Sequence, residues 1–141
     1  MSWLKKHKGA IFWVAAIAYM AFIFYLSSRP APELARRIPI IYKLKIVHMA
    51  EYGLLSILFF FALKETSAAR SLEAAYFAVV AVFLYGAIDE LHQVFVPMRS
   101  ASLVDIVANC IGATVAQWGL LSYTKQRERV TDQTAPHQAP G

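Results

Sequence analysis

The sequence predicts an all-α integral membrane protein that folds as a bundle of four transmembrane helices. Of its 141 residues, 58% are hydrophobic and only 16% are charged, whereas soluble domains average about 45–50% apolar and about 25% charged residues. The apolar residues are also gathered in four long runs. Each run approaches the roughly 20 residues that an α-helix needs to cross a bilayer.

The first apolar run covers residues 10–26 and follows three lysines, so it resembles a signal peptide. Its 17 residues nevertheless exceed the about 7–15 residues of a typical signal-peptide core, and the Ser-Ser-Arg-Pro sequence after it is a poor cleavage site. We therefore expect a retained membrane helix here, with a cleaved signal peptide as the alternative.

The third run is long enough to cross a membrane only when its polar end is included. It is purely apolar only over residues 74–88, which at about 1.5 Å per residue gives about 22 Å, less than the ~30 Å hydrocarbon core of a bilayer. Counting on to Val96, just before the helix-breaking Pro97, gives a complete span over residues 74–96. The polar residues 89–93 are therefore predicted to lie in the last turns of a membrane helix.

The second apolar run covers residues 46–63 and the fourth covers residues 103–121. Together the four runs form one predicted membrane domain over residues 1–124. The polar residues 125–141 that follow are expected to be a disordered tail. The single cysteine, Cys110, excludes an internal disulfide and a cysteine-based metal cluster.

The net charge of +5 informs topology. Most basic residues lie between the apolar runs, and no basic patch with interleaved aromatic residues is present, so we expect no nucleic-acid partner. With four spans, both termini lie on the side of the second connection, which carries eight Lys and Arg residues against six on the other side. This excess predicts cytoplasmic termini. The first connection disagrees, because it carries Arg36 and Arg37.

An antiparallel bundle would bring the unusual polar residues to one end. They open the second and fourth runs, end the third, and occupy the short link between the third and fourth. Ionisable residues within a span cost about 2.5–3.5 kcal/mol on insertion scales and usually face the protein interior or a partner. We therefore predict a functional polar cluster, formed by His48, Glu51, Tyr52, Asp89, Glu90, His92, Gln93, Arg99, Asp105 and Asn109.

Spacing in the fourth run predicts that its polar residues face the bundle. Asp105, Asn109 and Gly112 share one helix face, and Ala116 extends this row as a small-x-x-x-small pattern typical of close helix packing. Within the cluster we expect an ion pair between Arg99 and an aspartate, because a guanidinium can bind a carboxylate through two hydrogen bonds. Simpler interpretations remain open, namely helix capping at Asp105 and an interhelical hydrogen bond from Asn109.

Three motifs resemble the VanZ-like family of bacterial membrane proteins over roughly residues 14–121. They are HMAEYGLL, DELHQVFVPMR and SLVDIVANCIGA. The family often has glycine where this chain has Met98 and again where it has Ala116. Because glycine tolerates positive φ, the first departure predicts a stiffer turn. The positions that match the family pattern are His48, Glu51, Tyr52, Asp89, Glu90, Gln93, Pro97, Arg99, Asp105, Asn109 and Gly112.

The resemblance implies a multi-pass protein of the bacterial cytoplasmic membrane with a role at the cell envelope. The family is named for a protein associated with low-level resistance to teicoplanin, a lipoglycopeptide. The resemblance implies no mechanism and no cofactor. It leaves open whether the chain forms a homo-oligomer.

Three functions are compatible with the polar cluster. The first is binding or modification of a membrane lipid, a lipid-linked ligand or a lipophilic antibiotic. The second is an embedded hydrolase or transferase that acts on a lipid-linked substrate, with carboxylates that could hold a divalent metal. The sequence has no His-Glu-x-x-His motif, serine elbow or P-loop, so we assign neither catalytic residues nor metal ligands. The third function is structural, with a polar network that holds the helices together.

Overall fold

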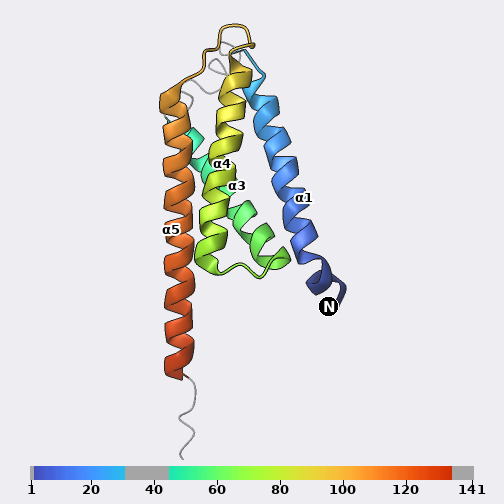
Figure 1. Cartoon of the computed structure of the whole chain (residues 1–141), viewed down its shortest axis with the longest axis vertical. Coiled ribbons are helices and arrows are strands. Elements are labelled where there is room, and N and C mark those ends of the chain that lie inside the picture. Colours follow the sequence, from blue (N-terminus) through green and yellow to red (C-terminus); the bar gives the residue numbers. More distant parts are fainter. Residues whose placement is uncertain (1, 31–44, 135–141) are drawn as a thin grey trace, which may run out of the picture.

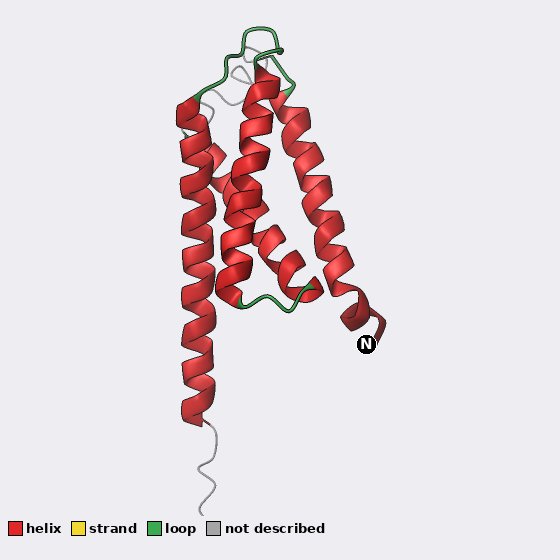
Figure 2. Cartoon of the chain, viewed as in Figure 1, coloured by secondary structure: helices red, strands yellow, loops and turns green. Residues whose placement is uncertain are grey.

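The computed structural model describes residues 2–30 and 45–134 (Figure 1). This part of the chain forms only helices and connecting loops (Figure 2). The helices are α1 (Ser2–Ser27), α3 (Ile46–Thr66), α4 (Ser71–Gln93) and α5 (Leu103–Thr134). All four are long and apolar enough to cross a membrane. The predicted all-α membrane bundle is thereby confirmed.

The third predicted span ends earlier than expected. Helix α4 ends at Gln93 rather than at Val96, because the backbone N–H groups of Phe95 and Val96 donate to His92 and Gln93 in two successive tight turns. The residue before a proline avoids helical backbone angles, so the helix cannot continue through Val96 to Pro97. Residues 89–93 do lie in the last turns of the helix, as predicted.

The fourth helix extends beyond the expected start of the polar tail. Helix α5 continues from Leu103 to Thr134, past residue 125, because the Lys, Gln, Arg and Glu residues in this segment are good helix formers. The remainder of the expected tail, residues 135–141, lies outside the described residues. The same holds for residues 31–44 of the first connection, including Arg36 and Arg37.

Helix α3 is the central helix of the bundle. It packs against α1, α4 and α5, and it crosses obliquely behind α4 in Figure 1. The C-terminus of α1, the C-terminus of α4 and the α4–α5 link gather at one end of the bundle, whereas α1 begins and α5 ends at the other (Figure 1). The topology therefore brings together the segments that carry the predicted polar cluster.

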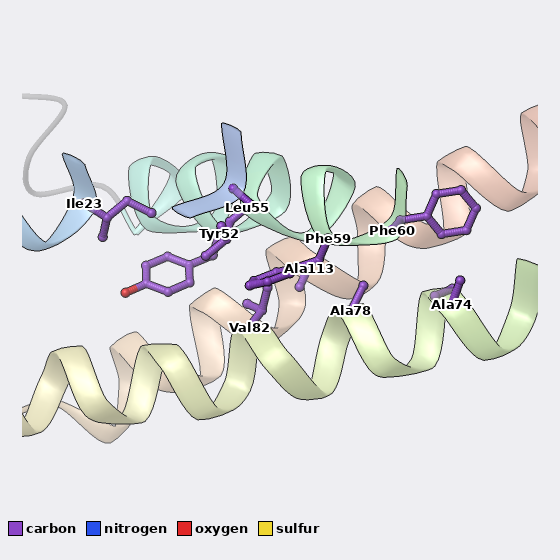
Figure 3. Packing of buried hydrophobic residues seen from close by; sticks show 11 residues of the cluster. Ile23, Tyr52, Leu55, Phe59, Phe60, Ala74, Ala78, Val82 and Ala113 are labelled. Carbon is purple, nitrogen blue, oxygen red and sulfur yellow. The ribbon is translucent and has the colours of Figure 1, made fainter. Parts of the chain in front are cut away.

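The hydrophobic core joins large residues on α3 to small residues on its neighbours. Tyr52, Leu55 and Phe59 are buried and lie three or four residues apart, so they share one face of α3. The ring of Tyr52 closes the core at one end, and its hydroxyl points away from the other core residues (Figure 3). The small side chains opposite these residues are Ala74, Ala78 and Val82 of α4 and Ala113 of α5.

The closest helix contact is between α3 and α5. A Cβ atom added to Gly112 would lie 2.1 Å from the carbonyl oxygen of Met49, and one added to Gly53 would lie 3.2 Å from the carbonyl oxygen of Gly112. The two backbones therefore touch, as expected for a small-residue seam in a membrane protein. This contact fixes the depth at which the α3 and α5 members of the polar cluster face each other.

Candidate functional site

Asp89 is the hub of the polar cluster. Its carboxylate accepts hydrogen bonds from the Ser27 hydroxyl at 2.5 Å, from the Tyr52 hydroxyl at 3.2 Å and from the Gln93 amide at 3.1 Å. These donors come from α1, α3 and α4, and only 3% of Asp89 is exposed. Several hydrogen bonds are what allows a carboxylate to be buried. Asp89 thus joins three helices through one side chain.

Arg99 connects this hub to the end of α1. Its guanidinium donates to the Gln93 side-chain oxygen at 3.1 Å and to the backbone oxygens of Arg29 at 3.0 Å and Leu26 at 3.4 Å. A cation at the C-terminus of a helix is favoured by the helix dipole and by the carbonyls left without helical partners. Gln93 thus links Arg99 to Asp89, whereas a direct pair between Arg99 and an aspartate stays a prediction.

Glu90 and Asp105 organise the start of α5. The backbone N–H of Ser102 donates to the Glu90 carboxylate at 2.8 Å, and the Ser102 hydroxyl accepts from the backbone N–H of Asp105 at 3.3 Å. Asp105 also forms an ion pair with Lys45. Ser102 is therefore the N-cap of the helix, so the simpler capping interpretation of this segment is correct.

His92 contacts α1. Its Nε2 atom is 3.1 Å from the Ser28 hydroxyl, and its ring lies against Phe24 with centroids 4.2 Å apart. This places His92 at the interface between α4 and α1, beside the Asp89 hub. Asp89, His92 and Gln93 are three or four residues apart or adjacent at the end of α4, where Gln93 donates to Asp89 and His92 contacts Phe24 and Ser28.

Three members of the cluster keep unused hydrogen-bonding capacity within the described part of the chain. Asn109 is 1% exposed, and neither its amide nitrogen nor its amide oxygen has a hydrogen-bond partner there; the same holds for the buried Nδ1 atom of His48. The described residues also offer no hydrogen bond to the half-buried carboxyl group of Glu51. His48 and Glu51 both lie within electrostatic range of Asp89 and Arg99. The Asn109 amide and the His48 Nδ1 atom therefore add no hydrogen bond to the network that the described residues form.

The sequence analysis missed polar contacts on two helices. Ser27, the last residue of α1, and Ser28, which follows it, contact the cluster although both come after the first apolar run. In the bundle interior, the Gln117 amide donates to the Ser56 hydroxyl at 2.7 Å and to the Ser56 carbonyl at 2.9 Å. The spacing of four residues from Asp105 through Asn109, continued by two more steps, would have identified Gln117.

The described residues contain no group of three or more His, Cys, Asp and Glu side chains arranged to hold a metal ion. The carboxylates of the cluster are instead spread over separate partners. Asp89 faces hydroxyl and amide donors, Glu90 faces the backbone of Ser102, and Asp105 faces Lys45. The cluster is a hydrogen-bonded network in which three side chains, those of His48, Glu51 and Asn109, keep unused hydrogen-bonding capacity within the described residues.

A comparison with protein families finds one match to the chain. A family model described as VanZ/LLP1 matches residues 12–123, and this range includes every member of the polar cluster. A search of curated proteins finds no match, and a search of solved structures finds none either.

Proposed function

Because the chain belongs to the VanZ/LLP1 family and carries four helices able to span a membrane, we propose that its polar cluster binds the head group of a membrane lipid, a lipid-linked ligand or a lipophilic antibiotic at the bacterial cell envelope. The family assignment and the four helices identify a multi-pass membrane protein. The proposal concerns what the polar end of that protein recognises.

The observation that carries the proposal is the unused polar capacity of the buried Asn109 amide and the buried His48 Nδ1 atom, together with the half-buried carboxyl group of Glu51, to which the described residues offer no hydrogen bond. A buried polar group without a partner costs about 1–3 kcal/mol, and ionisable residues inside a membrane span usually belong to functional sites. Together these three side chains offer both donors and acceptors. They match a head group that carries a phosphate or carboxylate together with a hydroxyl or amine.

Binding to purified protein tests the proposal. The probes are a short-chain phosphatidylglycerol, a polyprenyl phosphate and teicoplanin. His48→Gln and Glu51→Gln keep the size of each side chain, so we expect about tenfold weaker binding, equivalent to about 1.4 kcal/mol, with an unchanged melting temperature. Glu65→Gln is the matched control, because Glu65 is exposed near the other end of α3. If no probe binds, or if every probe binds all variants equally, the proposal fails.

A purely structural function is the second candidate. It is favoured by the internal partners of Asp89, Glu90 and Asp105, which would hold the helices together without any ligand. On this account Asp105→Asn lowers thermal stability in detergent and changes a cellular phenotype only through the amount of protein. A stable Asp105→Asn variant with a lost phenotype would exclude the structural account.

We also propose that α1 is retained and that both termini are cytoplasmic, which places the polar cluster at the outer face of the cytoplasmic membrane. Retention is supported by Ser27 and by the carbonyls of Leu26 and Arg29, which complete the contacts of Asp89 and Arg99. Orientation is supported by the eight-to-six distribution of basic residues. Fusions of a cytoplasm-active and a periplasm-active reporter to the C-terminus test the orientation, and activity of the periplasmic reporter would reverse it.

A further inference from the structure

An apolar groove runs along the outer side of the contact between α3 and α5. Gly53 and Gly112 are buried in its floor, whereas Leu54 and Val115 are exposed and form its walls. Its volume of about 420 Å³ falls within the about 300–1,000 Å³ of typical small-molecule sites. The groove exists because the glycines let the backbones meet and leave the larger side chains standing on either side.

The groove starts at the polar end of the bundle. Ile46, the first residue of α3, lines its upper end, and Ile57 is its furthest residue along the same helix. At about 1.5 Å per residue, the groove therefore follows α3 for about 16 Å into the membrane-spanning segment. A hydrocarbon chain in the groove would thus have its polar end beside the polar cluster.

Lys45 supplies a cation at the mouth of the groove. It directly precedes Ile46, and 49% of its side chain is exposed although its ammonium group pairs with Asp105. An ammonium group has three N–H donors, so it can bind a second anion beside that carboxylate. A phosphate group at the membrane surface could form an ion pair with this ammonium group.

We propose that the α3–α5 groove holds one hydrocarbon chain of an anionic lipid whose phosphate contacts Lys45. This inference rests on the proposed function, since it specifies the ligand that reaches the polar cluster from within the membrane. The exposed cation Lys45, which directly precedes Ile46 at the end of the apolar groove, favours an amphiphile over a second copy of the chain.

The experiment uses the full chain in detergent with two lipid probes that share the same acyl chains. Phosphatidylglycerol is anionic and phosphatidylcholine has no net charge, and each carries a photoreactive diazirine in one chain. Native mass spectrometry measures lipid binding, and peptide mapping locates the cross-link. We expect phosphatidylglycerol to cross-link to residues 46–57 and 112–116.

Three variants separate the charge from the groove. Lys45→Gln should weaken phosphatidylglycerol binding about fivefold, as expected for one surface cation, and weaken phosphatidylcholine binding less, because the choline cation partly offsets the charge of its phosphate. Ala50→Phe fills the groove from an exposed position and should abolish the cross-link for both lipids. Thr114→Phe is the matched control, because exposed Thr114 lines a second groove, between α4 and α5, that shares only Val115 with the first; this variant should change neither result.

Two results would overturn this inference. One is labelling that Ala50→Phe leaves unchanged, and the other is a protein–protein cross-link through the groove, which would make a second copy its occupant. The proposed function fails separately, when the His48 and Glu51 variants bind every head-group probe as the unaltered chain does. The two sets of variants lie on different surfaces, so each failure can be identified.

Discussion

The Ser27 hydroxyl at the end of α1 donates to the buried Asp89 carboxylate on α4 at 2.5 Å. This hydrogen bond crosses the polar end of the bundle and attaches α1 to the hub that also binds Tyr52 and Gln93. Helix α1 is therefore part of the site, although the sequence pattern alone placed only the other three helices there.

Ser27→Ala should destabilise the protein, because it removes one of the three donors of a buried carboxylate. Hydrogen bonds to charged groups contribute about 1.5–3 kcal/mol, so we expect a loss of this order in SDS-induced unfolding. Ser100→Ala is the control, since Ser100 is exposed in the α4–α5 link. Equal stability of the two variants would show that the contact contributes nothing.

Gly112→Ala should be strongly destabilising, because the added Cβ would lie 2.1 Å from the Met49 carbonyl oxygen. Overpacking typically costs about 1–3 kcal/mol, and a backbone neighbour cannot rotate away. Gly119→Ala is the matched control on the same helix, since an added Cβ at Gly119 meets nothing within 4 Å. The control should be neutral or slightly stabilising, because alanine is the better helix former. If the unfolding midpoint changes by the same amount in both variants, the close backbone contact between α3 and α5 at Gly112 is contradicted.

Met98→Gly should stabilise the α4–α5 link. Met98 has φ 62°, which is unfavourable for any residue with a Cβ atom, and its side chain is 75% exposed. Left-handed backbone costs a non-glycine residue roughly 1–2 kcal/mol, and the greater entropy of glycine in the unfolded chain offsets part of this. We expect a net gain of up to about 1 kcal/mol. Met98→Ala retains the Cβ and should show no gain, so equal gains in both variants would argue against backbone strain.

Gln117→Leu should weaken the bundle without affecting ligand binding. It removes the hydrogen bonds to Ser56 in the interior, away from the polar cluster. Interhelical hydrogen bonds in membrane proteins contribute about 0.6–1.7 kcal/mol, so the unfolding free energy should fall by about 1 kcal/mol. Ligand titrations performed alongside should give unchanged affinities. A selective loss of affinity would instead extend the binding site into the bundle interior.

The fold was largely predictable because span length and apolar periodicity depend on local sequence. Helix ends were harder to predict. Val96 was placed in a helix by its apolar character, but the turn before Pro97 begins at the end of α4. Polarity alone predicts a disordered tail from residue 125 onward, although polar residues of this kind continue α5 to Thr134.

The location of the site was predictable from antiparallel topology, but the partners within it were not. The hydrogen bond from Ser27 to Asp89, and those from Arg99 to the carbonyls of Leu26 and Arg29, depend on how α1 approaches α4, which no spacing rule specifies. The unused atoms of Asn109 and His48 could be recognised only after every other polar partner had been located. The functional assignment of the predicted cluster stays a prediction until ligand binding is measured.

The glycine contact between α3 and α5 also divides the bundle mechanically. Because the backbones touch at Gly112 and Met49, α3 and α5 cannot slide or separate without losing that contact. We therefore expect these two helices to keep a fixed position relative to each other. The α1 end is instead anchored to α4 and the following link by side chains, chiefly Ser27 and Arg99, and side-chain bonds can be exchanged one at a time. We therefore expect any motion of the polar end to be a displacement of α1 relative to α4, while α3 and α5 stay in contact.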